Sequence, residues 1–117
     1  MSRYIKSFEG HNAETLKDKI ETFLKENRFT LQTRKNEYTW MRHGMGCWHC
    51  VIIKYEVNKI ELTAFIVYHK FEYVGLNLYR ESKEETESTI KGFFGGFGKW
   101  PIQRTIKRLQ KIISENI

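Results

Sequence analysis

The strongest structural signal in the sequence is CWHCVIIKYEVNKIELTAFIVYHKF, residues 47–71. β-Branched and aromatic residues fill most of it, and the break at Val57–Lys59 contains Asn58, a residue suited to a tight turn. We therefore predict two long antiparallel strands joined at Asn58. Because both strands are apolar at nearly every position, we expect the sheet to be covered on much of its surface.

The period of two that marks strands extends to both sides of this hairpin. Segments 28–34 (RFTLQTR) and 37–42 (EYTWMR) precede it, and the turn KNE lies between them. Segment 73–81 (YVGLNLYRE) follows it, and segment 3–10 (RYIKSFEG) provides a short strand at the start of the chain. Together these segments predict a meander of antiparallel strands.

Helical spacing of apolar residues appears before and after the strands. Asn12 is expected to cap the first helix and Asn27 to end it, whereas Pro101 suits the first turn of the last helix. A further helical segment is predicted to open at Ser82, where glutamates would lie near the positive end of its dipole. The residues predicted to face the core from the first and last helices are Leu16, Ile20, Phe23, Leu24, Ile102, Ile106, Leu109 and Ile113.

These elements predict a single α+β domain over residues 1–117. We expect a curved antiparallel sheet of five or six strands that packs against an N-terminal helix and a long C-terminal helix. The order β-α-β-β-β-β-β-α is that of helix-grip and TATA-binding-protein-like folds, and the analogy concerns architecture alone.

Composition narrows the class of protein. The 117 residues are 40% hydrophobic and 15% aromatic, which is typical of a folded globular chain. There is no apolar run of about 18 residues, and the first ten residues lack the features of a secretory signal. Two cysteines three positions apart do not form a disulfide scaffold. We therefore expect a cytoplasmic protein without transmembrane segments.

The chemically richest stretch is HGMGCWHC, residues 43–50. Cys47 and Cys50 have the spacing of a zinc knuckle or of a redox pair, but residues 51–53 continue directly as β-branched strand. On a strand, residues three apart project to opposite faces, so strand geometry separates the two thiols. We predict a strand here and no metal site or cofactor, with zinc binding and redox chemistry as alternatives. The imidazoles available as further ligands are His11, His43, His49 and His69.

The Gly-Phe-rich segment 92–100, GFFGGFGKW, matches neither a phosphate-binding loop nor a dinucleotide fingerprint. Its glycines are expected to let a helix lie close to the sheet, or to bend it, while its aromatic residues fill the core. An aromatic flap or a surface that dips into a membrane interface is the alternative. No nucleophile motif, metalloprotease motif or carboxylate pair is present, so we predict no catalytic residue and favour a binding protein over an enzyme.

Two surfaces are candidates for binding. The first is an apolar groove between the sheet and the C-terminal helix, lined by Trp40, Phe65 and Phe94, which would accept an apolar small molecule or a segment of a partner protein. The second is the basic side of the C-terminal helix, which would bind nucleic acid or another anionic surface unless acidic neighbours such as Glu87 offset its charge. Its residues are Arg104, Lys107, Arg108 and Lys111, in a chain with a net charge of +6. The sequence does not predict an oligomeric state.

Three segments carry a resemblance to a family of proteins. They are TWMRHGMG (39–46), IELTAFIVY (60–68) and IKGFFGGFGKWPIQRTIKRLQKI (90–112). Together they resemble a family of small, functionally uncharacterised bacterial domains, some of which join a zinc ribbon or membrane segments. The resemblance implies an α+β fold and a bacterial cytosolic setting, and it implies no reaction. This chain departs from the family by His43 in place of a lysine and by CWHC in place of an apolar strand.

Overall fold

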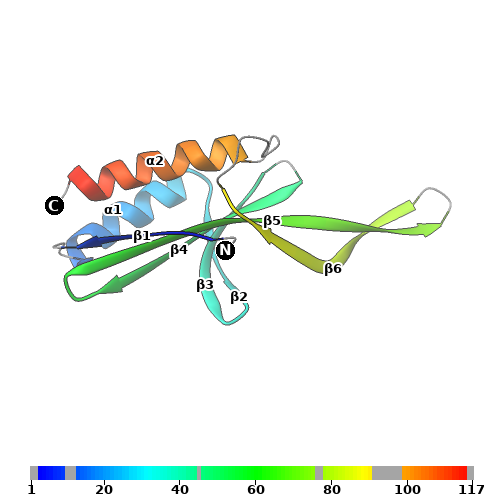
Figure 1. Ribbon diagram of the computed structural model, residues 1–117, viewed down its shortest axis with the longest axis horizontal. Coiled ribbons are helices and arrows are strands. Elements are labelled where there is room, and N and C mark those ends of the chain that lie inside the picture. Colours follow the sequence, from blue (N-terminus) through cyan, green and yellow to red (C-terminus); the bar gives the residue numbers. More distant parts are fainter. Residues whose placement is uncertain (1–2, 10–12, 45, 76–77, 91–98, 116–117) are drawn as a thin grey trace.

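The computed structural model describes residues 3–9, 13–44, 46–75, 78–90 and 99–115. It contains a six-stranded antiparallel sheet and two helices, which make an α+β fold (Figure 1). The order of the elements is the predicted one. They are β1 (Tyr4–Glu9), α1 (Ala13–Glu26), β2 (Thr30–Arg34), β3 (Glu37–His43), β4 (Cys47–Glu56), β5 (Lys59–Gly75), β6 (Leu78–Ser88) and α2 (Lys99–Glu115).

Strand β5 pairs with three other strands, β1, β4 and β6. The strand order is β1-β5-β4-β3-β2, and β6 also pairs with β5. β1 pairs with residues 59–64 of β5 and β6 with residues 66–75, so β1 and β6 follow one another along the same edge. The predicted turn between β4 and β5 is confirmed, because Asn58 has a φ of 61°.

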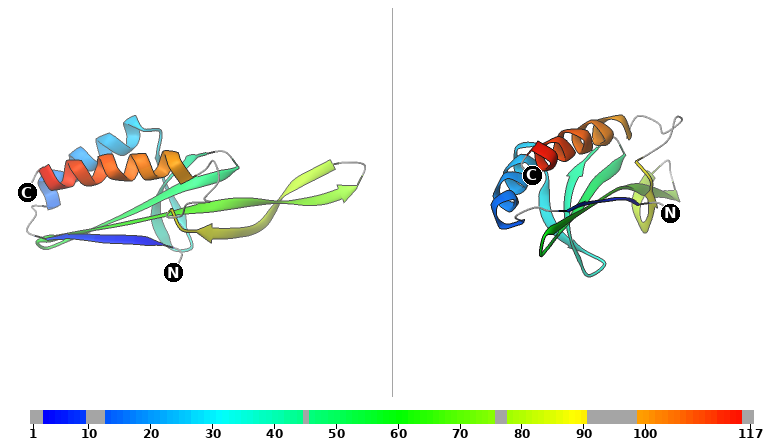
Figure 2. Two further views of the ribbon diagram at one scale, coloured as in Figure 1. Left: turned by 45° about the horizontal axis from the view of Figure 1, so that its top comes forward. Right: turned by 60° about the vertical axis from the view of Figure 1, so that its left-hand side comes forward.

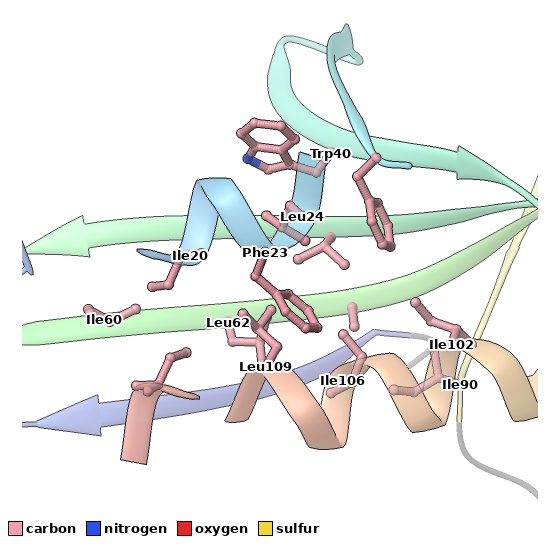
Figure 3. Packing of buried hydrophobic residues seen from close by; sticks show 14 of the residues in the cluster. Ile20, Phe23, Leu24, Trp40, Ile60, Leu62, Ile90, Ile102, Ile106 and Leu109 are labelled. Atoms are coloured by element: carbon pink, nitrogen blue, oxygen red, sulfur yellow. The ribbon is translucent and has the colours of Figure 1, made fainter. Parts of the chain in front are cut away.

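Both helices lie on one face of the sheet (Figure 2). The eight residues predicted to face the core from α1 and α2 are all buried. With residues from the strands beneath them they form one apolar cluster, which we call the main core (Figure 3). Among the helical residues described, neither helix has the length and apolar composition needed to cross a bilayer.

A second apolar cluster lies on the opposite face of the sheet, and we call it the second core. β5 shows the alternation that separates the two, because Ala64 and Ile66 belong to the main core whereas Phe65 and Val67 belong to the second. Buried apolar residues therefore lie on both faces of β4 and β5. The second core consists of Met41, Cys50, Ile52, Phe65 and Val67, with Trp48 packed against it.

Charged residues from distant segments close over the second core. Arg3 donates hydrogen bonds to Glu87 at 2.8 Å and to Glu37 at 3.1 Å. Arg34 also donates to Glu87, at 2.8 Å, and the guanidinium of Arg3 lies 4.2 Å from the centre of the Phe65 ring. Since Arg34 and Glu37 flank the turn of the β2–β3 hairpin, these contacts join one end of the strand order to the other. The sheet is therefore curved, as predicted.

Two local predictions are wrong. Residues 82–88 are not helical, because β6 continues to Ser88 in a ladder with β5. The left-handed residue after α1 is Arg28, with a φ of 69°, and not Asn27. Asn27 instead donates to the carbonyl of Phe23 from its backbone N–H and from its side-chain amide, which prolongs the helical hydrogen bonding by one residue.

Candidate functional site

The outer face of α2 carries four exposed cations, which we call the basic stripe. Their spacing of three and four residues aligns them on one side of the helix, opposite the residues that α2 buries in the main core. The structure thus places the stripe as the sequence predicts. Its members are Arg104, Lys107, Arg108 and Lys111.

Glu115 is a carboxylate neighbour of this stripe on α2 itself. Lys111 is 3.8 Å from Glu115, but both side chains are more than half exposed, and such pairs contribute little. Glu87, one of the acidic residues that could have offset the stripe, is instead held by Arg3 and Arg34 over the second core. The sheet therefore separates this carboxylate from α2.

A half-buried arginine anchors the start of α2. Arg42 of β3 donates to the Thr105 hydroxyl at 2.7 Å and to the Pro101 carbonyl at 3.4 Å. It also donates to the Asn27 carbonyl after α1, at 3.2 Å, and to Nδ1 of His49 in β4, at 2.9 Å. One guanidinium thus joins both helices to two strands. Burial lowers the pKa of Arg42.

Two further hydrogen bonds fix the rotation of α2 about its axis. Gln110 donates to the hydroxyl of Tyr4 in β1 at 2.6 Å, and Gln103 donates to the carbonyl of Ile90. Because these contacts lie on the side of α2 away from Arg42 and Thr105, the helix is held from both flanks. The basic stripe is consequently presented to solvent in a fixed orientation.

The role of Arg42 was not predicted from the sequence, in which His49 was considered only as a possible metal ligand. The available signal was the position of Arg42 two residues after Trp40 in a strand, which puts the cation on the same face as a core tryptophan. His49 is 3% exposed, and its Nδ1 accepts a hydrogen from Arg42. The imidazole is therefore neutral, with its proton on Nε2.

Gly44 is required by the position of His49. A Cβ atom at residue 44 would lie 2.5 Å from His49 Nε2 and 3.0 Å from Cys47 Sγ. Since Arg42 holds the imidazole from its other nitrogen, the ring has little freedom to move away. This close approach gives a structural reason for the first glycine of HGMG.

Replacing Gly44 by alanine is expected to lower the free energy of unfolding by about 1 to 2 kcal/mol through overpacking. Gly46→Ala is the matched control, because Gly46 has a φ of +67° and open space around its Cβ direction, so its cost is conformational. Urea unfolding of both variants, with and without His49→Ala, separates the two causes. A cost of Gly44→Ala that persists in the His49→Ala background would show that the imidazole is not what excludes the side chain.

The predicted lining of an apolar groove is not brought together. Trp40 lies in the main core, and Phe65 lies in the second core on the other face of the sheet. Phe94 lies outside the described residues. The inner residues of α2 pack directly into the main core, so the described residues of α2 and the sheet are in contact where the groove was expected (Figure 3).

A hollow of about 450 Å³ does lie on the surface between the two helices. Phe23 and Ile112 provide its apolar part, and the guanidinium of Arg108 lies 5.7 Å from the ring of Phe23. Charged side chains of α1 surround it, so it differs from the apolar groove that was predicted. The complete lining is Asp18, Lys19, Thr22, Phe23, Glu26 and Ile112.

The two cysteines project to opposite faces of β4. Cys47 belongs to the main core and Cys50 to the second core, and both are buried cysteines that form no disulfide. The strand prediction for this stretch is confirmed, and its geometry prevents the two sulfurs from binding one ion. Burial raises the pKa of the Cys47 thiol, which disfavours the reactive thiolate. In the described part of the chain, no three His, Cys, Asp or Glu side chains gather as metal ligands would.

Comparison with family models, with curated proteins and with solved structures finds no match for this chain. The resemblance to a family of small bacterial domains therefore stays a prediction. What the protein binds has to be inferred from the geometry and charge described above.

Proposed function

We propose that the protein is a non-enzymatic binding module that holds nucleic acid on the outer face of α2. The observation that supports this proposal is the basic stripe, four exposed cations on one side of a helix whose orientation is fixed by partly buried hydrogen bonds. The net charge of +6 adds long-range attraction for a polyanion. Two buried cysteines that form no disulfide suit a reducing compartment, so we place the module in the cytoplasm.

The chemistry of the stripe favours contacts with phosphates over contacts with bases. Arg104 and Lys111 are seven residues apart, which corresponds to about 10 Å along a helix. That length lets the stripe neutralise several phosphates of a duplex. The exposed side chains of α2 from Pro101 to Glu115 include no aromatic ring, so this surface offers no platform on which unpaired bases stack. We therefore infer that the module binds double-stranded nucleic acid with little sequence preference.

Binding to a short fluorescent DNA duplex is expected to weaken steeply with salt. Neutralisation of four phosphates gives a slope of log K against log salt of about −3.6, or a loss of roughly 100-fold between about 50 and 200 mM salt. Replacing the four cations of the basic stripe by glutamine should lower the affinity at least tenfold at low salt, because each lost contact removes its counterion release. Fluorescence anisotropy measures both quantities.

The control variant removes the same charge from elsewhere. Lys6, Lys17, Lys25 and Lys35 are exposed and lie outside α2, so their joint replacement by glutamine gives the same net charge. This variant should keep most of the affinity and most of the salt slope. Equal losses in the two variants would mean that net charge, and not the stripe, attracts the duplex.

A further inference from the structure

Strand β2 forms an open edge of the sheet. It pairs with β3 and with no other strand in the part of the chain that the structure describes (Figure 1). The β2–β3 ladder is regular over the whole of β2, Thr30–Arg34. Residues 30–33 are all exposed. The side of β2 that faces away from β3 is therefore accessible to another strand.

The direction of backbone hydrogen bonding alternates along β2. Lys35 and Asn36 form a two-residue turn with φ values of 49° and 65°. The residues that flank such a turn, here Arg34 and Glu37, exchange the first pair of hydrogen bonds of the hairpin. Every second residue of β2 then bonds to β3, and the residues between them direct their N–H and C=O groups outward. The outward residues are Leu31 and Thr33.

The outward row is limited to these two residues. Before Leu31, the next residue that points outward is Phe29, but its N–H already donates to the Leu24 carbonyl at 2.9 Å. After Thr33, the next position is Lys35, whose left-handed backbone leaves the strand. The open edge thus consists of two N–H donors and two C=O acceptors.

A second copy of the same edge is complementary to this short row. When two β2 strands pair antiparallel about a two-fold axis at Gln32, Leu31 of each copy lies opposite Thr33 of the other. All the outward groups of both copies are then used, in four hydrogen bonds. An axis at Leu31 sets Thr33 opposite Phe29, whose N–H is taken. An axis at Thr33 sets Leu31 opposite Lys35 in the turn. The axis at Gln32 therefore satisfies the edge best.

The side chains of β2 also suit self-pairing. Leu31 lies opposite Trp40 on the face of the helices, yet it is 51% exposed. About the axis at Gln32 the two Leu31 side chains become diagonal neighbours, within reach of one another. Residues 30–33 carry no charge, so no like charges meet among them. β1, another edge strand, has Lys6 in its middle, and lysine is typical of edges that are protected from pairing.

The shortness of the edge favours a second copy over a flexible peptide. Four hydrogen bonds give little affinity, and a flexible peptide would lose conformational entropy on becoming a strand. In a second copy the strand is already ordered by its ladder with β3. The ion pair of Arg34 with Glu87, at 2.8 Å, holds its end in place. This preorganisation removes most of the entropic cost.

We propose that β2 binds β2 of a second copy of this chain, antiparallel and about a two-fold axis at Gln32. The two sheets then become one continuous sheet, with the order β4-β3-β2-β2-β3-β4 at the junction. The contact uses the same surface on both copies, so it closes at a dimer. Because the contact is small, we expect the dimer at chain concentrations in the high micromolar range. It does not depend on nucleic-acid binding by α2.

A proline tests the edge itself. Thr33→Pro removes an outward N–H that β3 does not use, so the chain should stay folded and lose the dimer. Thr33→Val keeps the N–H and is the matched control. By sedimentation equilibrium at high micromolar concentration, the unaltered chain and Thr33→Val should have twice the monomer mass of 14.1 kDa, and Thr33→Pro the monomer mass. A monomeric unaltered chain, or a Thr33→Pro variant that is still dimeric, would overturn the proposal.

A charge exchange tests the register without altering the backbone, and it holds even if the proline variant does not fold. The variant Leu31→Lys with Thr33→Lys sets like charges opposite one another across the axis, as does Leu31→Glu with Thr33→Glu. Each should be monomeric by itself, and an equimolar mixture should return to the dimer mass. A mixture that stays monomeric would contradict the pairing of position 31 with position 33.

A cross-link tests the position of the axis. At Gln32 the two copies form a non-hydrogen-bonded pair, in which the Cα atoms are about 4.5 Å apart and within the span of a disulfide. Gln32→Cys should therefore form a covalent dimer under mild oxidation. Val57→Cys is the control, since Val57 is 91% exposed in the turn between β4 and β5. The native cysteines are buried and remain in both variants. Equal cross-linking of the two variants would overturn the proposed axis.

Discussion

Replacing Phe65 by alanine is expected to lower the free energy of unfolding by about 4 kcal/mol, the largest effect of a single substitution proposed for this chain. Phe65 is 0% exposed and lies at the centre of the second core, beneath the guanidinium of Arg3. Truncation removes the ring from its neighbours and leaves a cavity that the rigid strands around it fill poorly. It also removes the aromatic face on which Arg3 rests.

Urea unfolding checks this expectation, with Tyr38→Ala as the matched control. Tyr38 is also an aromatic residue of the sheet, but it is 75% exposed, so its truncation should change the free energy by less than about 0.5 kcal/mol. Phe65→Leu, which keeps most of the volume, should cost about 1 to 2 kcal/mol and stay folded if the alanine variant does not. Similar values for Phe65→Ala and Tyr38→Ala would show that the second core is not a packed interior.

Replacing Glu87 by alanine is expected to cost about 2 to 3 kcal/mol at neutral pH. Glu87 accepts hydrogen bonds from both Arg3 and Arg34, so its loss leaves two guanidinium groups close together without their shared carboxylate. Its side chain is 20% exposed, and water therefore reduces the cost below that of a fully buried pair. Glu56→Ala is the control, because the Lys59–Glu56 pair is exposed and contributes little.

The same carboxylate makes stability depend on pH. Its hydrogen bonds with Arg3 and then with Arg34 lower the pKa of Glu87 from 4.5 to about 2 in the folded state. A depressed folded pKa means that the unfolded chain binds the proton first on acidification, so the stabilisation is complete above about pH 4.5 and is lost as the pH falls towards 2. Thermal unfolding at a series of pH values should show this loss in the unaltered chain and a shallower dependence in Glu87→Ala. Parallel curves would contradict the role assigned to Glu87.

Much of the fold could be predicted because its signals are local. The β4–β5 hairpin is a run of β-branched residues broken at Asn58, and α2 repeats isoleucine and leucine at helical spacing. The basic stripe was predictable for the same reason, since the direction of a side chain on a helix follows from its position in the sequence.

The errors arise where distant pairing overrides local preference. Serine followed by glutamates favours the start of a helix, yet residues 82–88 form a strand. Backbone hydrogen bonds to β5 and the ion pair of Glu87 with Arg3, 84 positions away in the chain, stabilise that strand. No local window of sequence contains this information.

The assignment of Trp40 and Phe65 to one lining failed for a related reason. Alternation along each strand was evident, but the face shared by two strands depends on their register. Met41 pairs with Cys50 and Cys50 with Phe65, which places Phe65 on the face of Met41 and away from Trp40. Register is set by the whole sheet, and it cannot be obtained from any one strand.

Because β1 and β6 pair with β5 along the same edge, the order in which the strands are synthesised affects folding. β1 leaves the exit tunnel before β5, but the residues with which it pairs follow 50 to 60 positions later, and the stretch that continues the same edge comes later still. β1 must therefore wait, without its partner strand, until β5 has been translated. We expect slow acquisition of the native state and a reliance on chaperones that shield nascent β segments, in contrast to a helical bundle of equal length.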